Sequence, residues 1–384
     1  MFEYKDKKRL IPFTDRLLLL NSKLNLGTQA LTPLNYTQEK EKFFRSDTYN
    51  PQFIYELRDT SIMKRDLYSL QQELHTIHLQ SDLRDYISDY LQSVARTIDC
   101  IDAIGTPRFA KAANLIFTFE EVDGKKFLQN MPFISFNKSN ACVLQNAEEM
   151  AETFRKYISN AQLSYDIQID YQNDHIIRVG HNKLIIGAKV KRLCSNVKRL
   201  IVHEIESHIF QRHNLLTAQN PLLRIIPHAD SMLWGEGLAV YNEIQSGTIT
   251  QSAYETYYYR VKAVEMLHKS FREIFDYLSR YVTAEKAYMI TYRVKRGMGD
   301  TSLPGGYAKD ASYAIGYQTV DNYIRNNGCL ELLYTSRVPH IGELLLEHEL
   351  LEPSVLKLPT HTTLVQPKPQ TNPFVFTKSS ILTS

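Results

Sequence analysis

The stretch that most constrains the fold is the hexapeptide HEIESH, which runs from His203 to His208 after an apolar lead-in. In the common pattern H-E-x-x-H, two histidines at i and i+4 share one helix face and bind zinc, and the Glu serves as base. Here the second histidine comes one residue later, which places the two side chains about 140° apart on an ideal α-helix instead of about 40°. A π-bulge absorbs one extra residue, and such bulges cluster at functional sites. The sequence therefore predicts either a π-type distortion across 203–208 or no metal site there.

A second motif, WGEGLA at 234–239, offers a third metal ligand. Glu236 stands between two glycines and is followed by an apolar stretch, which predicts a helix start directed back at the first motif. Two His and one Glu are an established ligand set of catalytic zinc. The alternative is an acidic residue in a first helical turn, where the helix dipole favours it.

These two motifs, followed by RVKRG at 293–297 and GGYAKDASYAIG at 305–316, resemble the microtubule-associated tyrosine carboxypeptidase family, including its bacterial relatives with a QEGLA motif. Their order and spacing match from about residue 90 to 352. The resemblance implies a zinc carboxypeptidase that removes a C-terminal tyrosine, with Zn²⁺ on His203, His208 and Glu236 and with Glu204 as the base. Gly235 stands where the bacterial pattern has Gln, which bears on substrate detail more than on metal binding.

The same resemblance implies the partner: the C-terminus of a protein or peptide, which is a tubulin tail only if the chain is eukaryotic. Two other functions remain open. One is a non-catalytic binder of acidic C-terminal tails on the same fold, and the other is a zinc endopeptidase. An endopeptidase would not need basic residues that receive a terminal carboxylate.

The periodicity of the chain predicts an α+β fold that is rich in helix, with a small β-sheet before the metal-binding helix. A strand pair in that position fits a zincin-like layout, and the family resemblance implies that the protein is a zinc metallopeptidase. Apolar residues recur at three and four from 53 to 104, while 163–190 alternates and contains a hairpin signature around Gly180. Further helices are expected over 252–292, 318–326 and 341–351. We expect an irregular leader over 1–50, a helical region over 51–150, the zinc peptidase region over 151–357 and a loosely ordered tail over 358–384.

Composition narrows the class of protein. The net charge of +3 over 384 residues is too small to suggest a nucleic-acid binder. The four cysteines lack C-x-x-C spacing, which predicts neither a disulfide framework nor a thiolate zinc site and favours a reduced, cytoplasmic protein. No signal peptide and no apolar run of membrane-spanning length are seen, so no membrane partner is expected.

A carboxypeptidase must also hold the terminal carboxylate of its substrate, which an Arg fork or a Lys point charge can do. The candidates are Arg293, Lys295, Arg296 and Lys309, in Gly-rich, loop-like sequence. Arg296 and Lys309 are preferred because they lie inside the segments that carry the resemblance. Asp310 is expected to pair with one of the basic residues.

The remaining polar candidates concern the reaction and the metal ligands. Tyr307 or Tyr313 is expected to offer a hydroxyl to the tetrahedral oxyanion. Glu206 and Glu243 could each either orient a ligand histidine or face solvent, and we expect them to face solvent.

Overall fold

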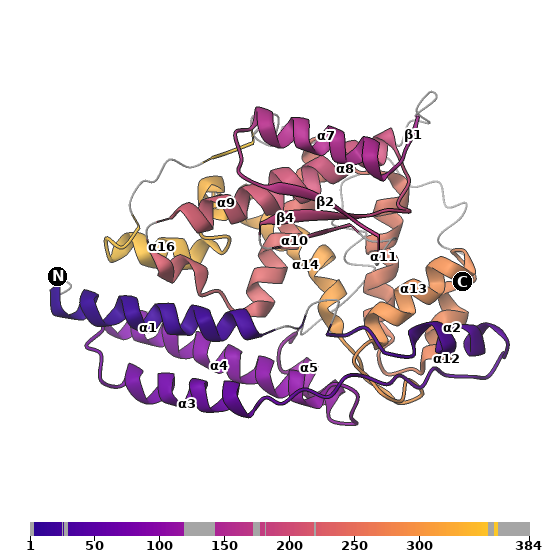
Figure 1. The fold of residues 1–384 in the computed structure, drawn as a ribbon, viewed down its shortest axis with the longest axis horizontal. Coiled ribbons are helices and arrows are strands. Elements are labelled where there is room, and N and C mark those ends of the chain that lie inside the picture. The colour runs from indigo at the N-terminus through magenta and orange to yellow at the C-terminus, as the bar shows by residue number, and fades with distance from the viewer. Residues whose placement is uncertain are drawn as a thin grey trace.

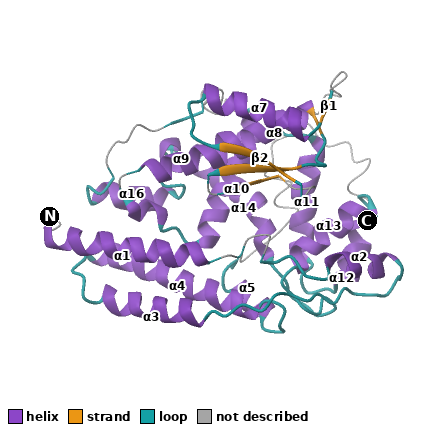
Figure 2. Cartoon of the chain, in the orientation of Figure 1, coloured by secondary structure: helices purple, strands orange, loops and turns teal. Residues whose placement is uncertain are grey.

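The computed structural model describes residues 4–24, 26, 30–118, 143–171, 177–180, 182–218, 220–351 and 357–359. The described residues form many helices and two small sheets, which confirms the α+β class (Figure 2). The zincin-like part of that expectation stays a prediction. The division into regions likewise remains untested, and nearly all of the expected tail over 358–384 lies outside the described residues.

The N-terminal helices line one side of the molecule (Figure 1). They are α1 (Tyr4–Lys23), α3 (Ser61–Leu74), α4 (Ser81–Ala103) and α5 (Phe109–Asn114). The expectation of an irregular leader over 1–50 is wrong in its local structure. The α1 helix buries Leu10, Phe13, Leu17 and Leu20 against α3 and α4, and α2 (Tyr36–Phe44) buries Phe43 among the aromatic residues of the C-terminal helices. The three-and-four spacing of α1 was hidden by the many polar residues around it.

The main sheet lies on the opposite side, between α7 (Ala147–Asn160) and the centre of the molecule (Figure 1). Its strands are β2 (Asp166–Asp170), β3 (Ile177–Val179) and β4 (Lys183–Gly187), in the order β2-β4-β3. The β3–β4 pair is antiparallel, with Ile177 opposite Ile186, so the predicted hairpin is confirmed. The β2–β4 pair is parallel. A separate pair, β1 (Leu144–Gln145) with β5 (Arg192–Leu193), leads into α8 (Cys194–Leu200).

The centre of the molecule is built from η1 (Ile201–Ile209) and α10 (His228–Gln245), which carry the two motifs, and from the helices that neighbour them. These are α9 (Phe210–Thr217), η2 (Pro221–Arg224) and α14 (Ser312–Arg325). Glu236 therefore lies in the middle of α10, and the predicted helix start at the WGEGLA motif is wrong. Pro227 precedes the first helical residue, His228, and residues 228–233 extend the helix by more than a turn before the motif.

The remaining helices complete the core. They are α11 (Gln251–Glu265), α12 (Phe271–Leu278), α13 (Ala284–Lys295), η3 (Ala308–Ala311), α15 (Leu330–Thr335) and α16 (Pro339–Glu347). Helices were expected over 252–292, 318–326 and 341–351. The structure confirms helix in each region with shifted ends, and it divides the first region among α11, α12 and α13. An apolar cluster rich in aromatic residues joins α11, α12 and α13 to α2 and α5.

Two glycines allow α10 and α14 to cross at backbone contact. A Cβ on Gly237 would lie 2.3 Å from the Gly316 carbonyl oxygen, and one on Gly316 would lie 2.2 Å from the Leu233 carbonyl oxygen. Any side chain at either position would force the helices apart. The second glycine of WGEGLA thus brings the segment with Lys309 and Tyr313 close to Glu236.

The cysteines differ in part from expectation. Cys194 is disulfide-bonded, whereas Cys100 and Cys329 carry free thiols. The expectation of a reduced chain is therefore wrong for Cys194, because spacing along the chain does not report which thiols the fold brings together. Among the described residues, no helix is both long and apolar enough to cross a membrane.

Candidate metal centre and active site

The helix that carries the two histidines is widened as the sequence requires. The whole of η1, Ile201–Ile209, is a π-helix, which confirms the predicted distortion. The extra residue per turn brings His203 and His208 to the same face, with ring centroids 5.1 Å apart and ring planes at 84°. Both imidazoles can therefore reach one ion.

Glu236 of α10 meets the two histidines. Its Oε2 lies 3.6 Å from Nε2 of His203 and 3.5 Å from Nε2 of His208. Ligand atoms bound tetrahedrally at the 2.0–2.1 Å typical of zinc stand about 3.3–3.4 Å apart. The carboxylate oxygen thus lies from each histidine nitrogen at nearly the spacing of two zinc ligands, and ligand atoms of the three residues lie within 4.8 Å of one another.

The hydrogen bonding and charge of this cluster suit a site that binds a cation. Oε2 of Glu236 is buried and has no hydrogen-bond partner among the described residues. Burial alone would lower the pKa of His203, yet the neighbouring carboxylates of Glu236 and Glu243 raise it to about 10. The carboxylates therefore favour positive charge at this imidazole, and the donor set of two neutral His nitrogens and one carboxylate fits a zinc ion.

Glu243 is fully buried, and the expectation that it faces solvent is wrong. Its Oε1 accepts hydrogen bonds from Nδ1 of His203 at 2.7 Å, from Arg199 of α8 at 2.7 Å and from the Tyr257 hydroxyl of α11 at 2.9 Å. Seven residues separate Glu236 and Glu243, two helical turns, so both lie on one face of α10. The bond to Nδ1 leaves Nε2 of His203 as the free ligand nitrogen.

The two other carboxylates of HEIESH differ from each other. Glu206 is 3% exposed and accepts a hydrogen bond from the Tyr157 hydroxyl of α7, so the expectation of a solvated side chain is wrong for it too. Glu204 is half-buried, and no hydrogen bond or ion pair within the described part of the chain engages its carboxylate. Glu204 is therefore the carboxylate of this helix that remains available to a reacting group.

A cluster of basic residues lies next to Glu236, around the buried carboxylate of Asp310. Arg293 binds Asp310 through Nε at 2.5 Å and through a terminal nitrogen at 2.8 Å. Arg260 approaches the same carboxylate at 3.4 Å, and Arg296 at 3.8 Å. Burial alone would raise the pKa of Asp310, but the guanidinium groups, with Arg293 foremost, hold it well below its usual range. The expected pairing of Asp310 with a basic residue is present.

Lys309 and Arg296 are paired less closely with carboxylates than Arg293 is. Nζ of Lys309 lies 3.5 Å from Oε1 of Glu236. Arg296 is 5% exposed, its guanidinium lies over the Tyr307 ring at 5.2 Å, and its Nε has no hydrogen-bond partner among the described residues. Burial lowers the pKa of Lys309, and Arg296 and Arg293 lower it further against the attraction of Glu236. Arg293 is held by Asp310, so Arg296 and Lys309 remain the groups available to an incoming anion.

These basic residues are less loop-like than their sequence suggested. Arg293 and Lys295 end α13, Arg296 caps it, and Lys309 lies in η3. Lys295 is fully buried and donates to the carbonyl oxygens of Leu303 and Gly305, so it supports the Gly-rich loop and is not exposed to a substrate.

The two tyrosines lie in different surroundings. The Tyr313 ring stacks near that of His203, with centroids 6.3 Å apart and an interplanar angle of 22°. The guanidinium of Arg260 lies over the Tyr313 ring, 4.7 Å from its centroid. Tyr307 is fully buried beside Phe109 and Phe117, and its hydroxyl has no hydrogen-bond partner in the described part of the chain. Tyr313 is thus the one in ring contact with a histidine of the cluster.

Three arginines of the site were not found from the sequence. Arg199 and Arg260 bind Glu243 and Asp310 from α8 and α11. Arg337, before α16, donates to the Ser231 hydroxyl at 2.7 Å, and its side chain passes beside Gly235. A sequence signal existed only for Glu243, two turns from Glu236 on one helix; the arginines come from distant segments without a motif.

Comparisons with known proteins point to one family. A family model described as microtubule-associated tyrosine carboxypeptidase matches residues 41–381. Microtubule-associated tyrosine carboxypeptidase 1 of Rattus norvegicus is 27% identical over 305 residues, which cover 75% of this chain and 54% of the relative. The Homo sapiens protein of that name is 26% identical over 346 residues, which cover 81% of this chain and 63% of the relative. The chain thus spans between half and two thirds of the length of these relatives.

Proposed function

Because the chain belongs to the microtubule-associated tyrosine carboxypeptidase family, we propose that it is a zinc metallocarboxypeptidase on a zincin-like fold. It hydrolyses the C-terminal peptide bond of a protein or peptide and releases tyrosine. The observation that supports this most is the convergence of His203, His208 and Glu236 on one point, with a buried, unpartnered carboxylate oxygen.

His203, His208 and Glu236 hold the ion, and Glu243 fixes the ring of His203. Zinc in such a set supplies Lewis-acid chemistry, because it polarises the scissile carbonyl and lowers the pKa of water at the site. A carboxylate oxygen of Glu204 takes the proton of the attacking water and returns it to the nitrogen of the leaving amino acid. Its carboxylate is partly exposed and makes no hydrogen bond or ion pair with the described residues, which suits it to this exchange.

Lys309 and Arg296 receive the terminal carboxylate of the substrate. In a C-terminal residue, the carboxylate carbon lies at most about 4 Å from the scissile carbonyl carbon, since three bonds join them. A basic group that binds it must therefore stand close to the metal ligands. Lys309, 3.5 Å from Glu236, meets this requirement, and Arg296 stands behind it beside Asp310. The hydroxyl of Tyr313, or that of Tyr307, is then available to the oxyanion.

The test uses purified full-length protein, zinc and matched peptides that end in Tyr, in Phe or in an amidated Tyr. We expect one zinc per chain, release of free tyrosine and no cleavage of the amidated peptide. If a site hydrogen bond reads the phenol, the peptide ending in Phe should be cleaved far less well. Equal turnover of amidated and free peptides would establish an endopeptidase, and peptide binding without turnover would establish a binding protein.

A further inference from the structure

The serine inside HEIESH makes a contact that a regular α-helix does not allow. The Ser207 hydroxyl donates to the carbonyl oxygen of Val202, five residues back, at 2.9 Å. In an α-helix a serine hydroxyl bonds to the carbonyl three or four residues back. The fifth carbonyl comes within reach because η1 is widened to a π-helix. This bond therefore exists in the π form of the helix and is lost in the α form.

Two further residues fix the orientation of that hydroxyl. Nδ2 of Asn242, on α10, donates to Oγ of Ser207 at 2.8 Å and to the Tyr334 hydroxyl of α15 at 2.9 Å. Because the Ser207 oxygen accepts from Asn242, its own hydrogen is left to point at Val202. The network thus joins η1 to α10, the helix that carries Glu236.

This polar network lies in an apolar environment. Ser207 and Tyr334 are fully buried and Asn242 is 4% exposed, beside the apolar cluster that contains Ile205, Ile209 and Leu238. A buried hydroxyl or amide costs free energy unless it is hydrogen-bonded, and an apolar residue would pack there without that cost. The arrangement is therefore expected to do something that apolar packing does not.

We propose that Ser207 and Asn242 are positioning residues that hold the metal-binding helix in its π form. The inference rests on the proposed function, because it assigns to this form the task of bringing His203 and His208 to one ion. Without the hydroxyl, the α form gains relative to the π form, and in the α form the two side chains point about 140° apart. The loss of Ser207 should therefore weaken metal binding although Ser207 touches no ligand atom of the cluster.

The experiment measures the zinc dissociation constant of the full chain by competition with a chromogenic chelator, together with the absorption spectrum of the Co²⁺ form. We expect Ser207→Ala to raise the dissociation constant about tenfold or more, in the range seen when a supporting residue of a metal site is removed. Asn242→Leu should act in the same direction with a smaller effect. Ser207→Thr, which keeps the hydroxyl, should retain near wild-type affinity.

Thr14→Val is the matched control. Thr14 is fully buried, and its hydroxyl donates to Leu10, four residues back, in the ordinary helix α1. It should therefore lose a comparable hydrogen bond and some stability without any change in zinc affinity. An equal loss of affinity in this control would show that the effect of Ser207→Ala is one of general stability, and would overturn the proposal.

A crystal structure of the metal-free Ser207→Ala variant gives a second, metal-independent answer. We expect a regular α-helix through 201–209, and an unchanged π-helix with unchanged affinity would overturn the proposal. If Ser207→Ala does not fold, Asn242→Leu and Tyr334→Phe carry the same two measurements. A wild-type chain that binds no zinc would instead overturn the proposed function, while the helix geometry would still decide whether Ser207 holds the π form.

Discussion

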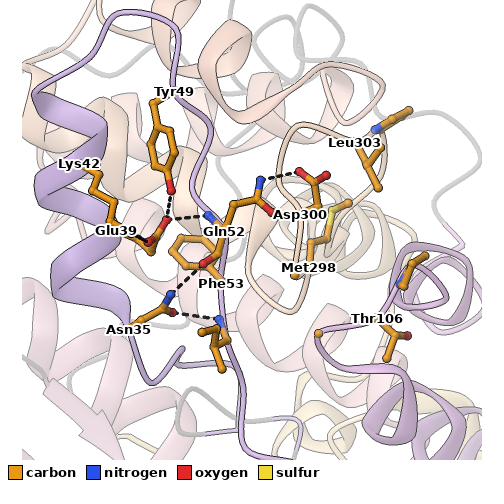
Figure 3. A pocket seen from close by; sticks show the side chains of 15 residues that line it. Asn35, Glu39, Lys42, Tyr49, Gln52, Phe53, Thr106, Met298, Asp300 and Leu303 are labelled. Carbon is orange, nitrogen blue, oxygen red and sulfur yellow. Dashed lines mark hydrogen bonds and ion pairs between the residues drawn. The ribbon is translucent and has the colours of Figure 1, made fainter.

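Two polar regions of the molecule invite comparison: the His203–His208–Glu236 cluster and the cavity beside α2 (Figure 3). The cavity has a volume of about 510 Å³ and contains two carboxylates, those of Glu39 and Asp300. Among the described residues, these carboxylates are bound by groups of the chain itself. Glu39 accepts from the Tyr49 hydroxyl at 2.6 Å and the Gln52 amide at 2.7 Å, and it pairs with Lys42. Asp300 accepts from Gln52 and Ser302.

The difference lies in what the polar atoms still lack. In the cavity, the carboxylates are matched by donors of the chain itself, so they join the segment after α2 to the loop around residue 300. At the cluster, an oxygen of Glu236 is buried with no hydrogen-bond donor in the described part of the chain, and two imidazole nitrogens converge on it. Polar atoms that converge without hydrogen-bond partners indicate a ligand-binding site better than the presence of a cavity does.

Removal of a cluster residue should have the largest effect of any change in the molecule. His203→Ala or Glu236→Ala should remove the metal, because catalytic zinc sites use three protein ligands and each variant leaves only two. Peptidase activity should then fall by roughly a thousandfold or more, since the ion supplies several kcal/mol of stabilisation to the transition state. Elemental analysis and a peptide assay measure both; full zinc content in Glu236→Ala would remove Glu236 from the ligand set.

Glu204→Gln separates the reaction from metal binding. The amide cannot take a proton, so activity should drop by about 10²–10⁴-fold, as when a general base is lost. Zinc content should stay at one per chain, because Glu204 is outside the ligand set. The variant is compared with wild type by kcat and by metal analysis in parallel, and retained activity would assign the base role to another group.

Arg296→Ala tests the basic cluster. A charge-assisted hydrogen bond to the substrate carboxylate contributes roughly 1.5–3 kcal/mol, so kcat/KM should fall about tenfold to a hundredfold or more. Arg293→Lys is the useful comparison, since it removes the bidentate contact with Asp310. Any effect of this variant on substrate binding should come through Asp310. An Arg296→Ala enzyme with unchanged kcat/KM would leave Lys309 as the sole partner of the carboxylate.

Glu243→Gln acts on the ion through His203. An amide in place of the carboxylate weakens the hold on Nδ1 of His203, and such changes typically cost about 10–100-fold in metal affinity. Chelator competition gives the zinc dissociation constant, and long-range proton–nitrogen NMR reports which nitrogen of His203 carries the proton. Equal affinity and an equal tautomer in the variant would show that Glu243 serves only to bury the charge of Arg199.

The smallest effect on activity is expected in the cavity. Glu39→Gln removes a charge that three internal donors satisfy, so the free energy of unfolding should fall by about 1–3 kcal/mol. The kinetic constants should match those of wild type, and the loss should appear in chemical denaturation. A large loss of peptidase activity in this variant, with the fold intact, would contradict the contrast between the two regions.

Several features of the site could be predicted from sequence because they depend on residues close together in the chain. The spacing of His203 and His208 required a widened helix, and the structure has one. The hairpin at Gly180 and the helices after residue 252 likewise follow from local periodicity. Helix α1 was missed although Leu10, Phe13, Leu17 and Leu20 recur at three and four, since an amphipathic pattern among many polar residues becomes evident only when a partner surface is known.

The sequence by itself determined which groups can bind a metal ion and what deformation of the helix they need, because side-chain chemistry and helical geometry are local properties. Only the tertiary structure decided which carboxylates are buried. The sequence suggested that Glu243 and Glu206 face solvent. In the fold, Arg199 of α8 and Tyr257 of α11 donate hydrogen bonds to Glu243, and Tyr157 of α7 donates one to Glu206. The same holds for Arg260 at Asp310. A buried charge is stable only beside partners that the fold assembles from distant segments, and no short pattern in the chain records that assembly.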